Sequence, residues 1–201
     1  MADLISKIKG LDNVTYDLKD EVSTFGETNL LENTTTWVSA SNATSQGSFS
    51  RVNDATAPGG TYVLWTCTTA GSAGGPHMNT TVWGDYNSKM INGQNYIFSV
   101  WVNCSAAKTF ATFNPERFSP IIKSSSASVA ANTWTRIWRV GTFNTSTSYQ
   151  SCPLYVSGGW TVGQTMKIAC PKLELGNKPT DWSPAPEDLA RYASETITFF
   201  Q

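Results

Sequence analysis

The sequence carries little charge of either sign. Charged residues make up 14% of the 201 residues and the net charge is −1, against about 25% charged residues in an average globular protein. Proteins that bind nucleic acid normally present a basic patch to the phosphates, and Lys and Arg form no cluster here. No basic amphipathic stretch of the kind that lies on a membrane surface occurs either. We therefore expect neither nucleic acid nor membrane insertion among the interactions of the chain.

Long hydrophobic runs are also missing. No window approaches the roughly 20 apolar residues of a transmembrane helix, and residues 1–22 contain no apolar core of a secretory signal peptide. We therefore expect a soluble chain made in the cytosol. Apolar residues still make up 40% of the sequence, which is enough for one domain with a sizeable core and short appendages.

The residues needed for hydrolytic chemistry are scarce. The single histidine, His77, lies in a Gly- and Pro-rich stretch that we expect to be a loop, and a Ser-His or Cys-His arrangement would have to use it. Asp54, Asp85 and Glu116 fall in separate expected loops, so no pair of carboxylates suited to glycoside hydrolysis can be recognised. No G-x-S-x-G, H-E-x-x-H or phosphate-binding glycine loop occurs. We predict no catalytic residues and a protein that is not an enzyme.

The four cysteines, Cys67, Cys104, Cys152 and Cys170, include no C-x-x-C pair. With only one histidine, the sequence has few candidate ligands for a Cys/His zinc site. Each cysteine lies in or beside an apolar, strand-like run, which favours buried free thiols. A disulfide formed late, outside the cell, is the alternative, and its pairing cannot be deduced from spacing.

Short strand-like runs separated by Gly, Pro, Asn and Ser dominate the chain from residue 28 onward. The clearest is Tyr96–Cys104, in which apolar residues fill one face and Ile97, Ser99, Trp101 and Asn103 fill the other. Many short strands favour an all-β fold, a β-sandwich or jelly roll, over residues 26–183. The expected strands lie at 29–31, 37–40, 48–52, 62–68, 80–83, 96–103, 109–113, 121–123, 133–143, 154–156 and 165–173.

Both flanks of this region have the spacing of helices. In residues 1–25 the apolar positions are Leu4, Ile8, Leu11, Leu18 and Val22. They form an a/d heptad seam that predicts an oligomerising coiled coil, most simply of identical chains. A helix of this length is marginal alone, so packing against its own domain is the other interpretation.

At the other end, residues 184–201 predict the start of a C-terminal helix. Ser183 can cap it, and Pro184 suits the first helical position. Glu187 and Asp188 favour the positive end of the helix dipole. Apolar residues then recur at helical spacing up to the last residues of the sequence, which we interpret as part of a longer protein.

Three stretches resemble one family. They are Asn29–Thr34 (NLLENT), Asn132–Arg136 (NTWTR) and Lys172–Asp188 (KLELGNKPTDWSPAPED). Together they are similar to carbohydrate-binding-module-like jelly-roll domains of phage tail, tail-fibre, baseplate and tail-tip proteins. The closing stretch is the most specific of the three, and the resemblance covers residues 28–188.

The resemblance implies several properties beyond the fold. In that family, flanking heptad segments form trimeric shafts, so it implies a homotrimer joined through the N- and C-terminal helices, contacts with other phage tail proteins, and a place in the virion tail. Many carbohydrate-binding jelly rolls hold a structural Ca²⁺, so the resemblance allows such an ion here. The sequence itself contains no calcium-loop pattern. No other cofactor or metal is expected.

Eight tryptophans make sugar stacking available, because flat aromatic rings bury large area and polar neighbours can hold hydroxyls. Trp37, Trp134 and Trp182 are assigned to packing, and Trp83 to either role. The candidates for an exposed, saccharide-binding surface are Trp65, Trp101, Trp138 and Trp160, each with packing or a subunit contact as the alternative.

Three of these candidates have informative neighbours. Trp101 shares a half-polar strand face with Ser99 and Asn103. Trp138 alternates with Trp134 and Arg136, so the three share a face unless a bulge intervenes. This conflicts with packing of Trp134 in the core unless Arg136 is paired. Trp160 follows two glycines, where a loop aromatic can meet a ligand.

The resulting functional hypothesis is a non-catalytic module that binds saccharides of the host surface during phage adsorption. The first alternative is a purely structural spacer or decoration of a trimeric tail fibre without a ligand of its own. The second alternative is a fragment of a tail-associated depolymerase.

Overall fold

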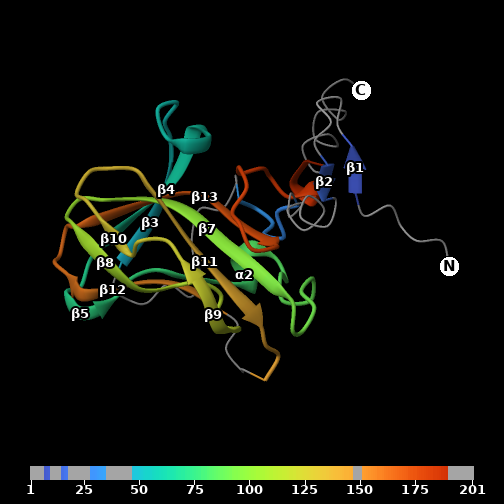
Figure 1. Cartoon of the computed structure of the whole chain (residues 1–201). Coiled ribbons are helices and arrows are strands. Elements are labelled where there is room, and N and C mark those ends of the chain that lie inside the picture. Colours follow the sequence, from blue (N-terminus) through green and yellow to red (C-terminus); the bar gives the residue numbers. More distant parts are fainter. Residues whose placement is uncertain (1–6, 10–14, 18–27, 35–46, 147–150, 190–201) are drawn as a thin grey trace.

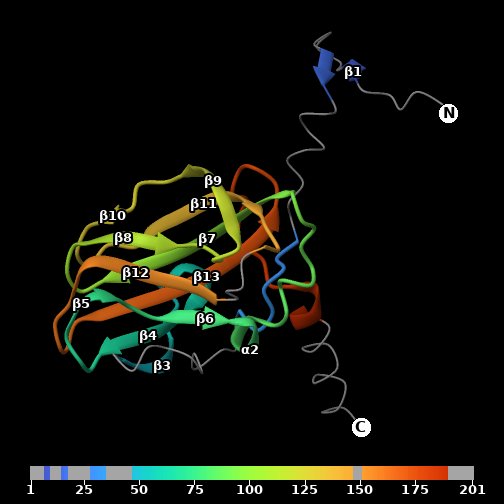
Figure 2. The same cartoon turned by 90° about the horizontal axis from the view of Figure 1, so that it is seen from below.

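The computed structural model describes residues 7–9, 15–17, 28–34, 47–146 and 151–189. Their main feature is a pair of antiparallel β-sheets packed face to face, which gives the β-sandwich seen in Figure 1 and, from below, in Figure 2. The all-β sandwich predicted from the strand pattern is therefore confirmed.

The larger sheet has six strands, and every neighbouring pair is antiparallel. Its centre is β7, which carries the clearest alternating run of the sequence. In spatial order the strands are β3 (Gly47–Asn53), β4 (Thr61–Cys67), β13 (Thr165–Leu175), β7 (Asn95–Cys104), β11 (Thr135–Phe143) and β9 (Phe118–Ser124).

The smaller sheet has five strands centred on β12, which pairs with three others. Its strands are β10 (Ser128–Val129), β8 (Lys108–Phe113), β12 (Ser151–Trp160), β5 (Gly71–Gly74) and β6 (His77–Asn79). A one-turn helix, α2 (Thr80–Trp83), and a 3₁₀ turn, η1 (Pro58–Gly60), connect strands. Outside the sandwich, β1 (Lys7–Lys9) pairs with β2 (Thr15–Asp17).

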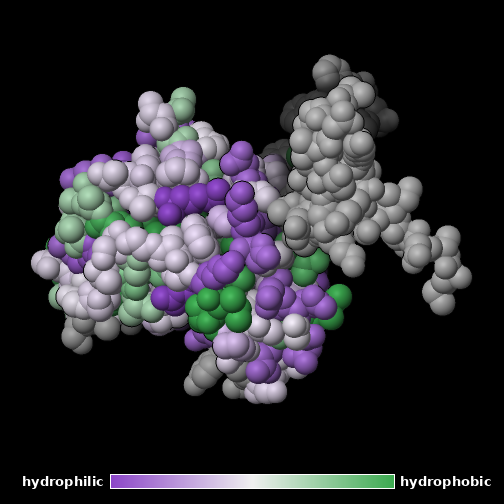
Figure 3. Space-filling model, in the orientation of Figure 1, coloured by the Kyte–Doolittle hydropathy of each residue, from purple (hydrophilic) through white to green (hydrophobic). Residues whose placement is uncertain are grey.

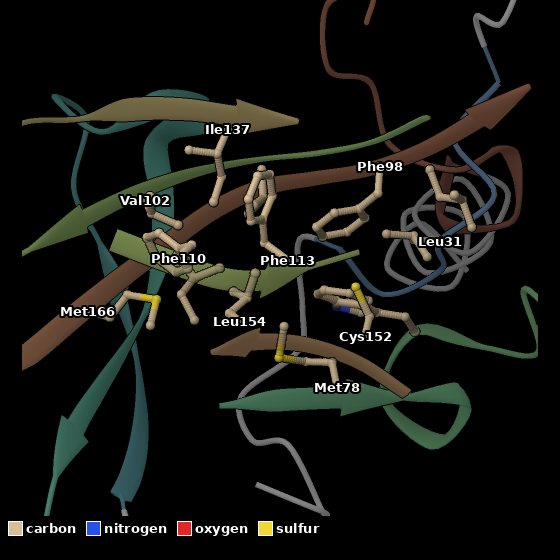
Figure 4. Packing of buried hydrophobic residues seen from close by; sticks show 14 of the residues in the cluster. Leu31, Met78, Phe98, Val102, Phe110, Phe113, Ile137, Cys152, Leu154 and Met166 are labelled. Carbon is tan, nitrogen blue, oxygen red and sulfur yellow. The ribbon is translucent and has the colours of Figure 1, made fainter. Parts of the chain in front are cut away.

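The core lies between the two sheets. Figure 4 shows side chains from both sheets pointing toward one another, among them Phe98 and Ile137 from the larger sheet and Phe110, Phe113 and Leu154 from the smaller one. All five are at most 2% exposed. Burying a side chain of this size stabilises the fold by about 1.5–3 kcal/mol, so this layer is the main source of stability.

The outer side of β7 is also partly buried, because the chain folds back over it after β13. Gly176 adopts φ 135°, a conformation that favours glycine, and turns the chain. Thr180 then donates to both carboxylate oxygens of Glu174, at 2.8 Å from its backbone N–H and 2.6 Å from its hydroxyl. The segment 176–185, which we call the closing segment, is thereby held on the larger sheet.

The opening segment, residues 28–34, is tied to the closing segment through Asn29. The Asn29 amide donates to the carbonyls of Pro171 and Ser183, each at 3.1 Å. Its carbonyl oxygen accepts from the N–H of Leu31 at 3.1 Å and of Leu173 at 3.2 Å. Four backbone groups from distant parts of the sequence thus depend on one buried side chain.

Several local predictions differ from the structure. Residues 80–83, predicted as a strand, form α2, and residues 29–31 run beside Leu173 without forming a strand. Strands β5, β6 and β10 were not predicted: β5 is Gly-rich and carries little β propensity, and β6 and β10 are only three and two residues long. The predicted strand at 37–40 lies outside the described residues. At the end of β13, Leu173 is buried and Leu175 is 48% exposed.

The predicted flanking helices are not shown. Residues 7–9 and 15–17 are paired strands rather than parts of a helix, and the rest of 1–25 lies outside the described residues. At the other end only 186–189 are described as helical, with Leu189 donating to Ala185 at 3.2 Å. None of the described helices is long and apolar enough to cross a membrane.

The four cysteines are buried free thiols, as the sequence favoured. Burial raises the pKa of Cys104 to about 12 and that of Cys170 to about 11. Burial also raises the pKa of Cys152 well above its ordinary value. The thiols of Cys104, Cys152 and Cys170 therefore stay protonated at neutral pH.

Candidate functional site

Aromatic side chains gather on the outer face of the larger sheet, the side away from the core. Trp101 pairs with Arg136 of β11 and Ala169 of β13, and Trp138 pairs with Ser99. Because Phe98, Val100 and Val102 of β7 point into the core, Trp101 points the other way. Trp101 and Trp138 are both half-buried.

Two further rings meet on this face. Trp134 and Tyr62 contact each other edge to face, with ring centroids 5.9 Å apart. Tyr62 lies on β4 and Trp134 directly precedes β11, with β13 and β7 between them. Neighbouring strands lie about 4.8 Å apart, so the two rings reach over the intervening strands. We call Tyr62, Trp101, Trp134 and Trp138 the aromatic face.

Charged and polar groups surround these rings. The Lys167 ammonium lies 5.0 Å from the centroid of the Tyr62 ring, which is cation–π distance. Asp54, near Lys167, has its pKa lowered, chiefly by hydrogen bonds from Thr56 and slightly by the Lys167 charge. The face therefore combines apolar rings with an ammonium and a carboxylate at its margin.

Pairing of Arg136 explains how Trp134, Arg136 and Trp138 share one face at the start of β11. Its guanidinium donates to the Ser99 hydroxyl at 3.1 Å and to the carbonyl of Thr180 in the closing segment. The guanidinium is thus paired, and Trp134 and Trp138 flank it on the outer face. The predicted common face of Trp134, Arg136 and Trp138 is correct. Trp134 packs against Tyr62, as its assignment to packing predicted, but it does so on the outer side of the sheet and not in the core.

Two of the four predicted surface tryptophans are buried. Trp65 is 0% exposed and Trp160 is 4% exposed, and their rings pack edge to face with centroids 4.7 Å apart. The Trp160 indole also donates to the carbonyl of Gly74 at 2.9 Å. The exposure predicted for both was therefore wrong, and the structure brings only Trp101 and Trp138 together on the surface.

The strand pattern contained the signal for part of this result. In β4, Val63, Trp65 and Cys67 alternate and all point inward. Period-two alternation places Trp65 in the core and Tyr62 outside. Trp160 gave no such signal, because it ends a strand whose register shifts between Ser157 and Trp160.

Trp83 and Trp182 have packing roles. Trp83 is fully buried and stacks at a tilt against Phe98, with centroids 5.9 Å apart. Trp182 is half-buried and donates to the carbonyl of Pro171 at 3.2 Å, in agreement with its assignment to packing. Trp37 lies outside the described residues.

His77 and Glu116, two of the titratable groups considered for catalysis, are engaged in local contacts. His77 belongs to β6 rather than to a loop, and its Nδ1 lies 2.7 Å from the Tyr155 hydroxyl. Burial lowers the pKa of His77, with a smaller opposing effect from Glu116. Glu116 accepts from the hydroxyl and N–H of Ser151. Among the described residues, no group of three or more His, Cys, Asp or Glu lies together as a metal site.

Most of the surface is polar. Figure 3 shows hydrophilic and intermediate colours over most of one face, with a compact hydrophobic patch over β9. On that strand Ile121 and Ile122 are 42% and 46% exposed. The patch lies on the edge strand of the larger sheet and is separate from the aromatic face.

Comparisons with known proteins give fold-level similarities only. Neither the protein-family models nor the curated proteins contain a match. Among solved structures, the CBM22-1 xylan-binding domain of a Paenibacillus barcinonensis protein has a TM-score of 0.46 and 12% identity, covering 76% of this chain and 94% of that one.

Two phage proteins are also similar. A tripod chain from the baseplate of bacteriophage Tuc2009 has a TM-score of 0.42 and 17% identity, and the match covers 83% of this chain and 63% of that one. Tailspike protein 4 of bacteriophage CBA120 has a TM-score of 0.41 and 16% identity, covering 76% of this chain and 21% of that one. At these TM-scores and identities, none of the similarities assigns a family or a ligand, so the residues of the site must carry the functional conclusion.

Proposed function

We propose that the chain is a non-catalytic, carbohydrate-binding-module-like jelly-roll domain of a phage tail or tail fibre, and that it binds saccharides on the host surface through the aromatic face. The observation that carries the proposal is the gathering of four half-buried aromatic rings on one side of the larger sheet. Rings of this kind supply stacking area at small cost in conformational entropy.

The polar neighbours of the rings suit the same ligand. The Lys167 ammonium lies over Tyr62, and Asp54 lies near Lys167. Ammonium groups donate to sugar hydroxyls and carboxylates accept from them, while the rings cover the apolar face of a pyranose. A single face of this kind binds weakly, and linkage of several chains raises the effective concentration of each.

The test is binding of the purified chain to a panel of bacterial surface polysaccharides. We expect Trp101→Ala and Trp138→Ala to weaken binding at least about tenfold, as truncation of an aromatic anchor does. Trp138→Phe should retain most of the binding because it keeps a ring. Val162→Ala is the matched control, because Val162 is 59% exposed and lies in the turn between β12 and β13. Each variant is checked for an unchanged melting temperature.

The spacer hypothesis has one observation in its favour. The Asp188 carboxylate accepts from the N–H of Asn33 at 2.8 Å and of Thr34 at 3.3 Å, so the segments entering and leaving the sandwich are joined at one place. A domain with adjacent ends can branch from a shaft without interrupting it. Folded protein that binds none of the panel would favour the spacer and reject the saccharide proposal.

Assembly into a trimer through the flanking segments belongs to the same proposal. Sedimentation equilibrium of the full chain should give three times the monomer mass of 21.9 kDa. A chain starting at Thr28 should sediment at lower mass. A monomeric full chain at micromolar concentration would reject trimer formation without affecting the saccharide assignment.

A further inference from the structure

Two cations, Arg136 and Lys167, lie on the same side of the larger sheet as the aromatic face. Arg136 precedes Ile137, and Lys167 lies between Met166 and Ile168; these three apolar side chains are buried in the core. Successive residues of a strand point to opposite sides of the sheet. Arg136 and Lys167 therefore point outward, together with the rings.

The guanidinium of Arg136 is held beside two of the tryptophans. Arg136 reaches from β11 to β7, where it donates to the Ser99 hydroxyl at 3.1 Å. Ser99 is the register partner of Trp138 and lies two residues from Trp101 on the same side of β7. Two residues of a strand span about 7 Å, and neighbouring strands lie about 4.8 Å apart. A sugar ring stacked on either indole would therefore have its substituents near the guanidinium.

Part of this guanidinium is available to a ligand. Its hydrogen bonds to the Ser99 hydroxyl and to the carbonyl of Thr180 both come from Nη2. A guanidinium has five N–H donors, so Nε and Nη1 keep three. Among the described residues, the buried side-chain N and O atoms that lack a partner belong to residues other than Arg136. Nε and Nη1 of the half-buried Arg136 therefore reach solvent.

The Lys167 ammonium lies at the opposite side of the ring cluster. It is 5.0 Å from the centroid of Tyr62, whose ring contacts that of Trp134. Only β7 separates β13, which carries Lys167, from β11, which carries Arg136. The two backbones are therefore about 10 Å apart across the sheet. An oligosaccharide lying over the rings would meet both cations.

Carboxylates of the protein leave both cations unpaired. Within the part of the chain that the structure describes, the ion pairs involve Lys89 and Lys172 and include neither Arg136 nor Lys167. Asp54 is influenced by the Lys167 charge but takes its hydrogen bonds from Thr56. Both cations are thus available to an anion from solution.

An anionic group on the ligand would complete these interactions. Guanidinium and ammonium groups bind carboxylate oxygens through charge-assisted hydrogen bonds, which are roughly twice as strong as neutral ones. A neutral sugar stacked on the rings would partly desolvate both cations without offsetting that cost. Because the guanidinium lies beside the indoles, an anion attached directly to a stacked sugar ring is the best placed to reach it.

We propose that the aromatic face selects an acidic saccharide, a chain of pyranose rings that bear carboxylates. The rings stack on Trp101 and Trp138, one carboxylate meets Nε and Nη1 of Arg136, and a second lies near Lys167. This inference rests on the proposed function of the face and adds the class of saccharide. Arg136 accordingly has two roles, because its Nη2 holds the closing segment while its other donors face the ligand.

The test compares two forms of one polysaccharide, a polyuronate and its carboxyl-reduced derivative, which keeps the same rings and linkages without the charge. Each is titrated into the full chain by isothermal titration calorimetry. The wild type should bind the polyuronate about tenfold more tightly than the reduced form, because of the charge-assisted bonds. Raising NaCl from about 50 mM to about 500 mM should remove most of this preference by screening.

Charge variants locate the preference on the face. Lys167→Gln should lower the preference for the polyuronate about threefold, as expected for a partly exposed charge. Arg136→Gln should lower it further, and Arg136→Lys should retain part of it. The ratio of the two affinities separates ligand binding from the structural role of Arg136, because unfolded protein weakens the binding of both forms equally.

Arg51→Gln is the matched control and should leave the ratio unchanged. It removes one positive charge from the same sheet. Arg51 is exposed and is the register partner of Val63, which points into the core, so its side chain lies on the other side of the sheet from the rings.

The outcomes separate this inference from the saccharide proposal. Equal binding of both forms by the wild type would overturn selection of acidic saccharides and leave saccharide binding intact. Binding of neither form would also overturn it, whereas the saccharide proposal fails only if the whole panel of polysaccharides is unbound. A preference that survives in both Lys167→Gln and Arg136→Gln would overturn the assignment of these residues. Equally tight binding of poly(glycerol phosphate), which has no sugar rings, would show a site for any polyanion and overturn the role of the rings.

Discussion

Lys172 and Glu174 form a buried ion pair on the outer side of β13, with Nζ and the carboxylate oxygen 3.3 Å apart and side-chain exposures of 1% and 0%. Lys172 also donates to the Thr180 hydroxyl at 2.6 Å and to the carbonyl of Asp181 at 2.7 Å. Glu174 accepts twice from Thr180. The pair thus anchors the closing segment beside the aromatic face.

The ion pair makes a prediction for stability. Removing one partner leaves a buried charge, so Lys172→Met should lower the free energy of unfolding by about 3–5 kcal/mol. The double variant Lys172→Met, Glu174→Leu removes both charges and should recover part of that loss. Urea unfolding of the wild type, both single variants and the double variant measures the coupling. A single variant within 1 kcal/mol of the wild type would contradict buried pairing.

The hydrogen bonds of Asn29 lead to a second prediction, which concerns the stability of the connection between the opening and closing segments. Asn29→Ala removes the partners of four backbone groups. Leaving buried polar groups unsatisfied costs about 1–3 kcal/mol each and is not additive, so we expect a loss of about 3 kcal/mol in chemical denaturation. Asn95→Ala, at an exposed position that starts β7, is the control and should change stability by less than about 0.5 kcal/mol.

Thiol reactivity gives a third prediction. Because burial raises the pKa of Cys104 to about 12 and of Cys170 to about 11, little thiolate forms at pH 8. A thiol reagent such as DTNB should react slowly with the native protein and rapidly with all four cysteines in denaturant. Rapid reaction of one equivalent under native conditions would show that one thiol is accessible.

The burial of His77 leads to a prediction for how the stability of the protein depends on pH. Burial lowers the pKa of His77 in the folded state below its ordinary 6.5, so the unfolded chain binds more protons as pH falls. The stability that depends on neutral His77 is complete above pH 6.5 and is lost as pH falls through the folded-state value. Relative to wild type, His77→Gln should lose less stability between pH 7 and pH 5 in thermal unfolding. Parallel profiles for the two proteins would exclude this role.

Much of the sandwich could be predicted because its central strands follow the period of two. In β7 and β4 the alternating residues point inward and outward as the pattern indicates. Burial of both faces of β7 could not be predicted, because the outer face is covered by residues 176–185, which fold back across the sheet. That contact joins Arg136 to Thr180, 44 residues apart in sequence.

The candidate site was predictable only in part for the same physical reason. Trp101 and Trp138 lie in regular strands, where alternation fixes the side that a residue faces. Trp160 lies beyond a register shift, and its burial follows from a tertiary contact with Trp65.

The most direct test of the saccharide proposal is the response of the tryptophan indole N–H signals during titration with a polysaccharide that the chain binds. The proposal predicts that the signals of Trp101 and Trp138 shift in proportion to bound ligand. The signals of Trp65, Trp83 and Trp160 should stay fixed, because these side chains are buried in the core. Shifts confined to residues outside the aromatic face, or no shift of Trp101 and Trp138 at saturation, would contradict it.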